Sequence, residues 1–251
     1  MERVIVTREK LVAVADAIRT KIGLTDFLTL DDMPNTIESI KGGISIEEIT
    51  NKTLKECVND SITKIGDYAF YDFRSLSVIR LPNVESIGTG SFTRCTGLKE
   101  LNFPKCKTIG SQSFTSCNGV LAINMPMLES VPQGAFNSIT RLSEINFPVM
   151  KKIETQGFYF CSSLERAEFG QLESIGQHGF NQTKISALII RAGAVCALVN
   201  ANAFLNSPVV RGEGYIYVPK ALVDSYKVAT NWTAYASQIR AIEDWPEITG
   251  G

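Results

Sequence analysis

The sequence predicts a β-rich solenoid of about seven coils, preceded by a helical segment and closed by an α/β cap. A phenylalanine recurs every 22 residues, and a branched aliphatic residue stands five positions before each one. The two columns are Phe70, Phe92, Phe114, Phe136, Phe158 and Phe180, and Ile65, Ile87, Ile109, Val131, Ile153 and Ile175. Self-similarity at a fixed period of roughly 20–50 residues is typical of stacked repeats. The two chain ends lack this period, which sets them apart as separate segments.

Each unit reads L-x-x-I-x-F-P-x-L-x-x-I-G-x-x-x-F-x-x-C-x-x. In its I-x-F step both apolar side chains point to the same side of a short strand, because strand side chains alternate. Proline then ends the strand, since it has no N–H to give to the ladder. Glycine after the second aliphatic residue is expected to take unusual dihedral angles at a tight corner. Coils stacked about 4.8 Å apart bury one continuous apolar core.

Several columns of this unit match a known repeat in register. Copies include LSVIRLPNVESIGTGSFTRC (76–95) and LKELNFPKCKTIGSQSFTSC (98–117). They resemble the BspA-type leucine-rich repeat, whose hallmark is L-x-x-I-x-L-P followed by I-G-x-x-A-F-x-x-C, over about residues 53–204. The resemblance implies a leucine-rich-repeat solenoid, placed here at residues 44–212, that serves adhesion and protein–protein contact rather than catalysis. The commonest family unit is slightly longer, so the curvature is expected to differ.

Residues 1–43 lie outside the repeat and are predicted to be helical. Apolar residues from Leu11 to Ile22 follow the i, i+3, i+4, i+7 spacing of an amphipathic helix, and Gly23 suits its end. A second short helix is expected within residues 30–40. The motifs ADAIRTKIG and LTLDDMP resemble a module at the N-termini of phage and prophage tail-associated proteins of Gram-positive bacteria. That resemblance implies attachment to other tail proteins or oligomerisation. The alternative is a helical cap on the first coil.

Residues 213–251 are predicted to form a strand–helix cap. The stretch YIYVP (215–219) suits a last strand ended by Pro219, which in turn suits the first position of a helix. Asn231 is expected to cap a further helix. The apolar side chains expected to face inward are Leu222, Val223, Tyr226, Trp232, Tyr235, Ala236 and Ile239. The segment also resembles the closing module of phage-encoded and BspA-type repeat proteins.

Composition argues against several functional classes. The net charge of −1 argues against nucleic acid and anionic membranes as partners, and no apolar run is long enough to span a membrane. The N-terminal residues MERVIVTREK have no apolar stretch or cleavage site typical of a secretory signal. The protein is therefore expected to act without Sec export, or its sequence begins after a removed signal.

The six cysteines occupy repeat columns that otherwise hold apolar residues. Cys95, Cys117 and Cys161 share a column with Phe73 and Ile139, and Cys106 shares one with Val84. This pattern favours buried, reduced thiols. A disulfide between Cys95 and Cys117 is the alternative, because stacked coils bring their Cα atoms within reach. No C-x-x-C pair is present, so a zinc site is not expected.

Catalytic chemistry finds little support in the residues. The single histidine, His178, falls in a variable column that is expected to be a solvent-facing turn. No phosphate-binding loop or calcium-binding spacing occurs. We therefore expect no enzyme activity, no cofactor and no metal ion.

The candidate binding residues flank the core isoleucine column on the first strand of each coil. Two outward columns are expected, Val78, Glu100, Ala122, Glu144 and Arg166, and Arg80, Asn102, Asn124, Asn146 and Glu168. Solenoids bind on such extended faces. The candidate ligand-binding set is Arg80, Glu100, Asn102, Asn124, Glu144, Asn146, Arg166 and Glu168. The alternative is a ladder of stacked amides that satisfies itself. Rival contacts are the turn residues Tyr71, Arg94, Tyr159 and Gln182.

These observations predict a non-enzymatic recognition protein of a phage or phage-like tail. Its solenoid is expected to bind a host-surface glycan or protein, or another tail component, while residues 1–43 join the tail or a homo-oligomer. Its expected location is then the virion. The alternative hypothesis is a bacterial cell-surface adhesin of the BspA type whose export signal has been removed.

Overall fold

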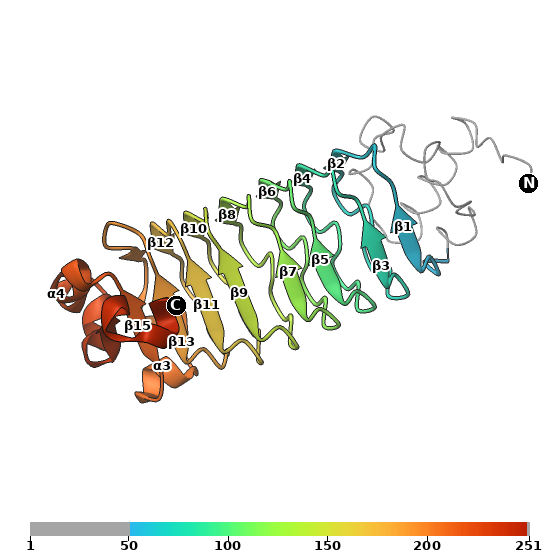
Figure 1. Ribbon diagram of the computed structural model, residues 1–251. Coiled ribbons are helices and arrows are strands. Elements are labelled where there is room, and N and C mark those ends of the chain that lie inside the picture. The colour runs from blue at the N-terminus through green and yellow to red at the C-terminus, as the bar shows by residue number, and fades with distance from the viewer. Residues whose placement is uncertain (1–50, 250–251) are drawn as a thin grey trace, which may run out of the picture.

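The computed structural model describes residues 51–249. They form an elongated stack of coils, each with a longer strand on one side and a two-residue strand on another (Figure 1). The helical segment predicted for residues 1–43 lies outside the described residues. No helix of the described part is long and apolar enough to cross a membrane.

The longer strands build one side of the stack and the two-residue strands another. The longer strands are β1 (Glu56–Val58), β3 (Val78–Arg80), β5 (Glu100–Asn102), β7 (Ala122–Asn124), β9 (Glu144–Phe147), β11 (Arg166–Phe169) and β13 (Ala187–Ile190). The two-residue strands are β2 (Lys64–Ile65), β4 (Ser86–Ile87), β6 (Thr108–Ile109), β8 (Ser130–Val131), β10 (Lys152–Ile153), β12 (Ser174–Ile175) and β14 (Ala197–Leu198). All the pairings between these strands are parallel, which confirms the predicted β-rich solenoid.

The strand register repeats the sequence period. Glu100 pairs with Ala122, and Glu144 pairs with Arg166, each 22 residues further on. Hydrogen-bonded ladders join β1 to β3, β5 to β7, and β9 to β11 and β13. Because β3 also lies beside β5, and β7 beside β9, the longer strands present one side of the molecule (Figure 1).

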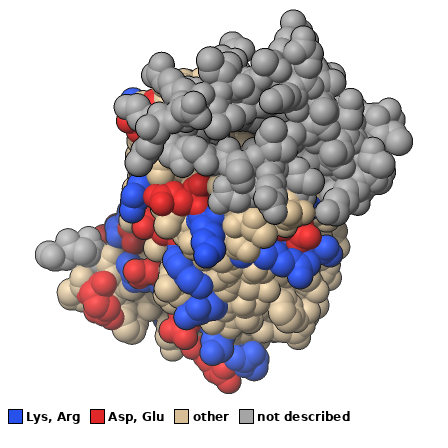
Figure 2. Space-filling model, turned by 90° about the vertical axis from the view of Figure 1, so that its right-hand side faces the viewer, with Lys and Arg blue, Asp and Glu red and all other residues tan. Residues whose placement is uncertain are grey.

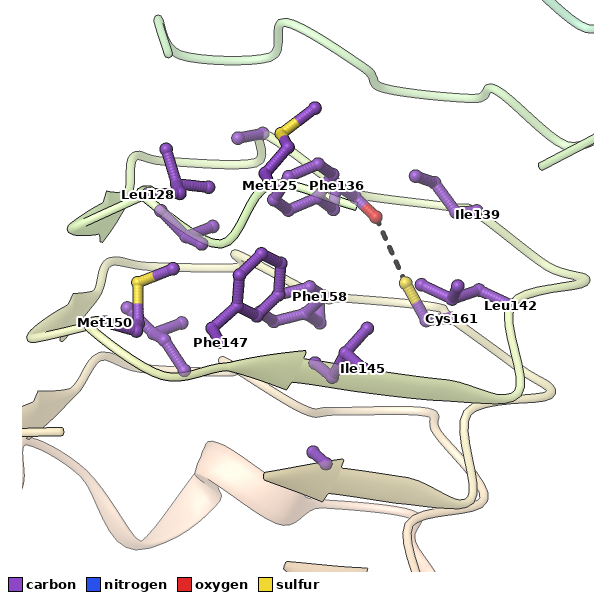
Figure 3. Close-up of a cluster of buried hydrophobic side chains, with 14 of the residues drawn as sticks. Met125, Leu128, Phe136, Ile139, Leu142, Ile145, Phe147, Met150, Phe158 and Cys161 are labelled. Atoms are coloured by element: carbon purple, nitrogen blue, oxygen red, sulfur yellow. Dashed lines mark hydrogen bonds between the residues drawn. The ribbon is translucent and has the colours of Figure 1, made fainter. Parts of the chain in front are cut away.

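The core is a column of stacked aromatic rings, as the repeat predicted. Phe114 is fully buried, with its ring 5.3 Å from that of Phe92 and 5.5 Å from that of Phe136, and the rings are nearly parallel. Figure 3 shows how Phe136 and Phe158 pack beside Met125 and Phe147 inside neighbouring coils. Equivalent residues thus contact each other from coil to coil, so each coil buries the apolar edge of the next.

The corner glycines have a different role from the one expected. Gly88, Gly110 and Gly176 do not have positive φ angles, so the prediction of unusual dihedrals was wrong. A Cβ atom at Gly110 would instead lie 2.3 Å from the backbone nitrogen of Thr89 in the preceding coil. Glycine is needed at these corners because adjacent backbones approach closely. Positive φ occurs two residues later, in the column Tyr68, Gly90, Gln112, Gly134, Gln156 and His178.

The turn containing each core phenylalanine adds a further ladder of hydrogen bonds. Phe92 N–H donates to Ser113 O at 2.7 Å, and Phe114 N–H donates to Ala135 O at 2.9 Å. Cysteine thiols bond in the opposite direction, for example Cys161 Sγ to Phe136 O at 3.1 Å (Figure 3). All six cysteines are free and buried, which confirms their predicted place in the core. The coils are therefore tied together around their perimeter as well as through their apolar interior.

Coil seven accommodates extra residues without losing the ring column. The spacing from Phe180 to Phe204 is 24 residues, yet their rings stack 5.7 Å apart. The additional length is taken up outside the core, before η1 (Ala201–Phe204), and α3 (Pro208–Arg211) follows. The longer interval is therefore accommodated without displacing the ring column.

The C-terminal residues close the stack. Strand β15 (Tyr215–Val218) pairs with β13, and β16 (Ile239–Ala241), which the sequence did not predict, pairs with β15. Between them lie η2 (Lys220–Leu222), α4 (Val223–Val228) and η3 (Trp232–Gln238). The chain then continues through η4 (Ile242–Asp244) and α5 (Pro246–Thr249).

Aromatic side chains of the cap satisfy backbone groups of the last coil. Trp232 Nε1 donates to Cys196 O at 2.6 Å, while Tyr226 Oη accepts from Cys196 N–H at 2.9 Å. Tyr235 Oη donates to Ala201 O. All three side chains are buried, as predicted. These side chains therefore cover the C-terminal end of the core and also bind backbone groups of the last coil.

Two details of the predicted cap were wrong. Asn231 has a left-handed backbone and does not cap the next helix; its Nδ2 donates to Leu198 O at 2.7 Å instead. Pro219 precedes η2 as the N-cap rather than occupying its first position. The predicted second helix is a 3-10 helix, and Ile239 begins β16. Contacts with coil seven, which no local pattern encodes, determine these conformations.

Candidate binding face

The outward side of β3, β5, β7, β9 and β11 forms the candidate site, called the outer face below. Alternation along each strand buries Leu101 and Ile145 while the residues on either side of them are exposed. Parallel pairing therefore aligns the predicted columns as two rows across the stack. The first row is Val78, Glu100, Ala122, Glu144 and Arg166, and the second is Arg80, Asn102, Asn124, Asn146 and Glu168. The structure thus brings all eight predicted binding residues onto one face.

Ion pairs occupy both ends of the outer face. At one end Arg80 Nη1 lies 3.6 Å from Glu56 Oε1, with both side chains largely exposed. At the other end Glu168 accepts from Arg166 Nη2 at 3.0 Å and from Arg191 Nε at 2.6 Å. Glu168 is the most enclosed of these groups, with 18% of its side chain exposed. Its two oxygens are already engaged, so among the predicted ligand residues it is the least available to a partner.

The side chains in the middle of the outer face are polar, and fewer of them are paired with one another. Asn124 Nδ2 donates to Asn102 Oδ1 at 2.9 Å, so one step of the amide ladder exists. Asn146, Glu100 and Glu144 are exposed, and their side chains have no hydrogen bond or ion pair within residues 51–249. The alternative of a ladder of amides that hydrogen-bond one another therefore holds for one pair of side chains and not for the whole row.

The same face changes character beyond β11. The second row continues from Glu168 to Ile189 and Tyr217, which are buried. Ile242 and Ile248 from the C-terminal segment cover them, with Trp245 packed alongside. Arg191 Nη2 also donates to Ile248 O at 2.7 Å. The sequence analysis missed this cover, although the strands ALII and YIYV are apolar at consecutive positions, as strands buried on both faces are.

The rival turn residues are engaged to different degrees. Gln182 Nε2 donates to Tyr159 Oη at 3.1 Å, and Lys52 lies over the ring of Tyr71. Arg94 is exposed and has positive φ, as expected for a turn tip. These residues lie on the turn side of the coils, so they do not join the outer face into one surface.

The short-strand side of the stack carries charges that neutralise one another. The row Glu85, Lys107, Glu129, Lys151 and Glu173 alternates in sign from coil to coil. Lys151 Nζ lies 2.9 Å from Glu129 Oε2, and this hydrogen bond raises the pKa of Lys151. Viewed from the N-terminal end, basic and acidic side chains are likewise interspersed (Figure 2). This side offers a partner little uncompensated charge.

Catalytic groups do not converge in the described part of the chain. His178 lies at a turn and contacts Asn181 Nδ2 at 2.9 Å through Nδ1. Burial raises the pKa of the Cys57 thiol to about 11 and those of Cys95, Cys106, Cys161 and Cys196 to about 12. Such thiols stay protonated near neutrality and are poor nucleophiles. Residues 51–249 hold no group of three side chains suited to a metal ion.

A surface hollow of about 320 Å³ lies beside coil seven. Two segments line it, residues 170–173 and 192–195, and Glu173 is their single ionisable side chain. Small-molecule sites need several convergent polar groups. This hollow therefore adds nothing to the outer face as a candidate site.

Comparison with protein families decides the classification. The family model described as "BspA type Leucine rich repeat region" matches six copies, over residues 32–127 and 105–210. The chain belongs to the BspA-type leucine-rich repeat family. BspA-type repeat proteins are typically binding proteins rather than enzymes, and no catalytic family is indicated.

Three solved structures are similar to this chain at low identity. A leucine-rich repeat protein from Eubacterium ventriosum is 18% identical, with a TM-score of 0.51, over 62% of this chain and 43% of its own. One from Bacteroides ovatus is 18% identical, with a TM-score of 0.46, over 65% and 54%. A leucine-rich cell surface protein from Faecalibacterium prausnitzii is 20% identical, with a TM-score of 0.46, over 72% and 43%. The chain thus spans about half the length of these structures. Comparison with curated proteins gives no match.

Proposed function

We propose that this BspA-type chain is a recognition protein that binds its target through the outer face and catalyses no reaction. The observation that carries the proposal is the middle of that face. There Glu100, Glu144 and Asn146 stand exposed and unpaired within the described residues, on strands held in register. The ladder fixes the backbone from which these side chains project, so the strands lose little conformational entropy when they bind a partner. The proposed targets are a host-surface protein or glycan, or another tail component.

The more specific proposal places the protein in a phage or phage-like tail. The resemblance of residues 11–40 to tail-associated modules supports it. In this proposal residues 1–43 join other tail proteins or a homo-oligomer, and the solenoid projects from the virion.

The second candidate is a bacterial cell-surface adhesin. Membership in the BspA-type family makes this candidate as plausible as the tail protein, because such proteins are commonly surface-associated. Neighbouring tail genes, and the protein in purified particles, would favour the tail. Its recovery from the cell envelope without particles would favour the adhesin.

The binding role of the face is tested by changing Asn102, Asn124 and Asn146 together to Ala. We expect stability to change little, because exposed substitutions usually shift it by about 0.5 kcal/mol or less. Binding to host cells or envelope extracts should weaken, because the hydrogen-bonding amides along one row are removed without any change of charge. The matched control changes three exposed glutamines elsewhere, Gln133, Gln171 and Gln177, to Ala. Equal binding by both triple variants would remove the asparagine row from the site and favour the turns.

The role of the N-terminal segment is tested by deleting residues 1–43. We expect a folded solenoid that still binds its target but no longer enters its assembly or oligomer. Circular dichroism, a binding assay and size measurement together give the result. A folded deletion variant that has lost target binding would assign recognition to the N-terminal segment or to avidity.

A further inference from the structure

The outer face carries uncompensated negative charge between two regions of paired charge. Arg80 pairs with Glu56 at one end, and Glu168 binds Arg166 and Arg191 at the other. Glu100 and Glu144 stand between them, exposed and without an ion pair in the part of the chain that the structure describes. Lys99 immediately precedes β5 and is not a member of either row. The centre of the face is therefore complementary to positive charge.

The spacing of the two carboxylates defines how far apart the partner's charges must lie. Glu100 and Glu144 occupy the same row on β5 and β9, with Ala122 on β7 between them. Two strand spacings correspond to about 10 Å. A peptide in the extended polyproline II conformation rises about 3.1 Å per residue with three residues per turn, so side chains three residues apart lie on the same side at a separation of about 9 Å. The small side chain of Ala122 leaves the space between the two carboxylates open to the side chains of a segment that lies along the adjacent asparagine row.

The adjacent row suits peptide groups. Asn124 donates to Asn102, which leaves the Asn102 amide N–H groups, the Asn124 carbonyl oxygen and the whole Asn146 amide available. These donors and acceptors match backbone C=O and N–H groups. The outward positions of β3 to β11 include no aromatic side chain on which the apolar side of a sugar ring could stack. The face therefore favours a polypeptide over a glycan.

The molecule already binds a polypeptide segment on the continuation of this face. Ile248 and Ile242 pack on Ile189 and Tyr217, and Arg191 donates to the backbone oxygen of Ile248. Arg191 also binds Glu168, the last member of the second row. The covered region is thus directly continuous with the open one.

We propose that the open outer face binds a protein segment in the extended polyproline II conformation, with two Lys or Arg side chains three residues apart. The segment runs along the stack, with its cations on Glu100 and Glu144 and its backbone on the asparagine row. This inference rests on the proposed function and names the partner class of the same face.

The test uses the full chain and labelled synthetic peptides of about twelve residues, long enough to cross the face. One peptide repeats Lys-Ser-Thr, a second has the same composition with its lysines contiguous, and a third repeats Glu-Ser-Thr. Fluorescence anisotropy should show tightest binding for the first and none for the third. Binding should weaken as salt rises from about 50 to about 150 mM, because exposed ion pairs are screened.

Paired variants assign the contact. The double variant Glu100→Gln/Glu144→Gln should weaken binding of the spaced peptide by about threefold to tenfold, as expected for two exposed ion pairs. The control Glu85→Gln/Asp224→Asn removes the same charge from exposed positions off the face and should bind like the parent. Equal affinity of the two double variants, or equal binding of the spaced and contiguous lysine peptides, would overturn the proposal.

Host extracts separate this inference from the proposed function. Extract binding lost in the asparagine triple variant but retained in Glu100→Gln/Glu144→Gln would overturn the basic segment as partner and leave the proposed function standing. Extract binding that is unchanged in both variants would overturn the proposed function of the face and the basic partner together. If the parent chain self-associates and the double variant does not, the outer face binds a second copy of this chain. That result would overturn the proposal that it binds a segment of another protein.

Discussion

Two regions of the same strand ladder meet solvent differently. From β3 to β9 the second row is polar and exposed, whereas at β13 and β15 it holds Ile189 and Tyr217, which the C-terminal segment buries. The backbone pairing is parallel in both regions. The ladder therefore provides a regular scaffold, and side-chain identity decides whether a given stretch becomes a surface or an internal interface.

Both regions rest on one core, and alkaline pH should produce the largest effect on it. Burial raises the pKa of the Cys106 and Cys196 thiols to about 12, whereas an unfolded thiol titrates near about 8.5. Above that pH the unfolded chain binds fewer protons than the folded one. Unfolding free energy should therefore fall as pH rises from about 9 toward about 12, by up to about 1.4 kcal/mol per pH unit for each thiol.

Urea denaturation across this pH range measures the effect. Cys106 lies between β5 and β6 and Cys196 between β13 and β14, both fully buried in the same core, so Cys106→Val and Cys196→Val should each reduce the slope by a similar amount. Unfolding free energy independent of pH above about 9 would contradict the burial of the thiols.

Removing one ring from the core column should have the next largest effect. Phe114→Ala deletes a fully buried ring that stacks on Phe92 and Phe136, and should lower the unfolding free energy by about 3–5 kcal/mol. The control is Phe160→Ala, the same change at a ring that is 40% exposed. Thermal and urea unfolding should separate the two variants clearly. A Phe114→Ala variant as stable as the parent would refute the ring column.

Exchanging apolar and polar side chains between the covered and open parts of the second row tests the comparison most directly. Ile189→Asn places an amide beneath the C-terminal segment and should cost about 2–4 kcal/mol, because it removes apolar contacts and buries a polar group. Asn146→Ile, two coils earlier in the same row, should change stability by about 0.5 kcal/mol or less, because that position is exposed. Urea denaturation of both variants gives the answer. Similar losses in the two would mean that the open region is covered as well.

The repeat made most of the solenoid and the eight candidate face residues predictable. Each coil repeats the same contacts, so one period in the sequence predicts the burial of Phe92, the outward direction of Asn102 and their alignment from coil to coil. The sequence pattern correctly predicted that the glycines stand at tight corners, but the physical reason it suggested, unusual dihedral angles, was wrong. Close approach of a neighbouring backbone is a property of stacked coils, and a single unit does not reveal it.

The sequence by itself determined the period, the core columns and the outward rows, because local alternation and stacking reinforce each other at every coil. The tertiary structure alone decided which side chains of those rows stay unpaired and where the chain returns to cover them. Arg191 binds Glu168 and also the backbone of Ile248, which lies 57 residues further along the sequence. Such contacts depend on the path of a non-repeating segment, and no periodic pattern records that path.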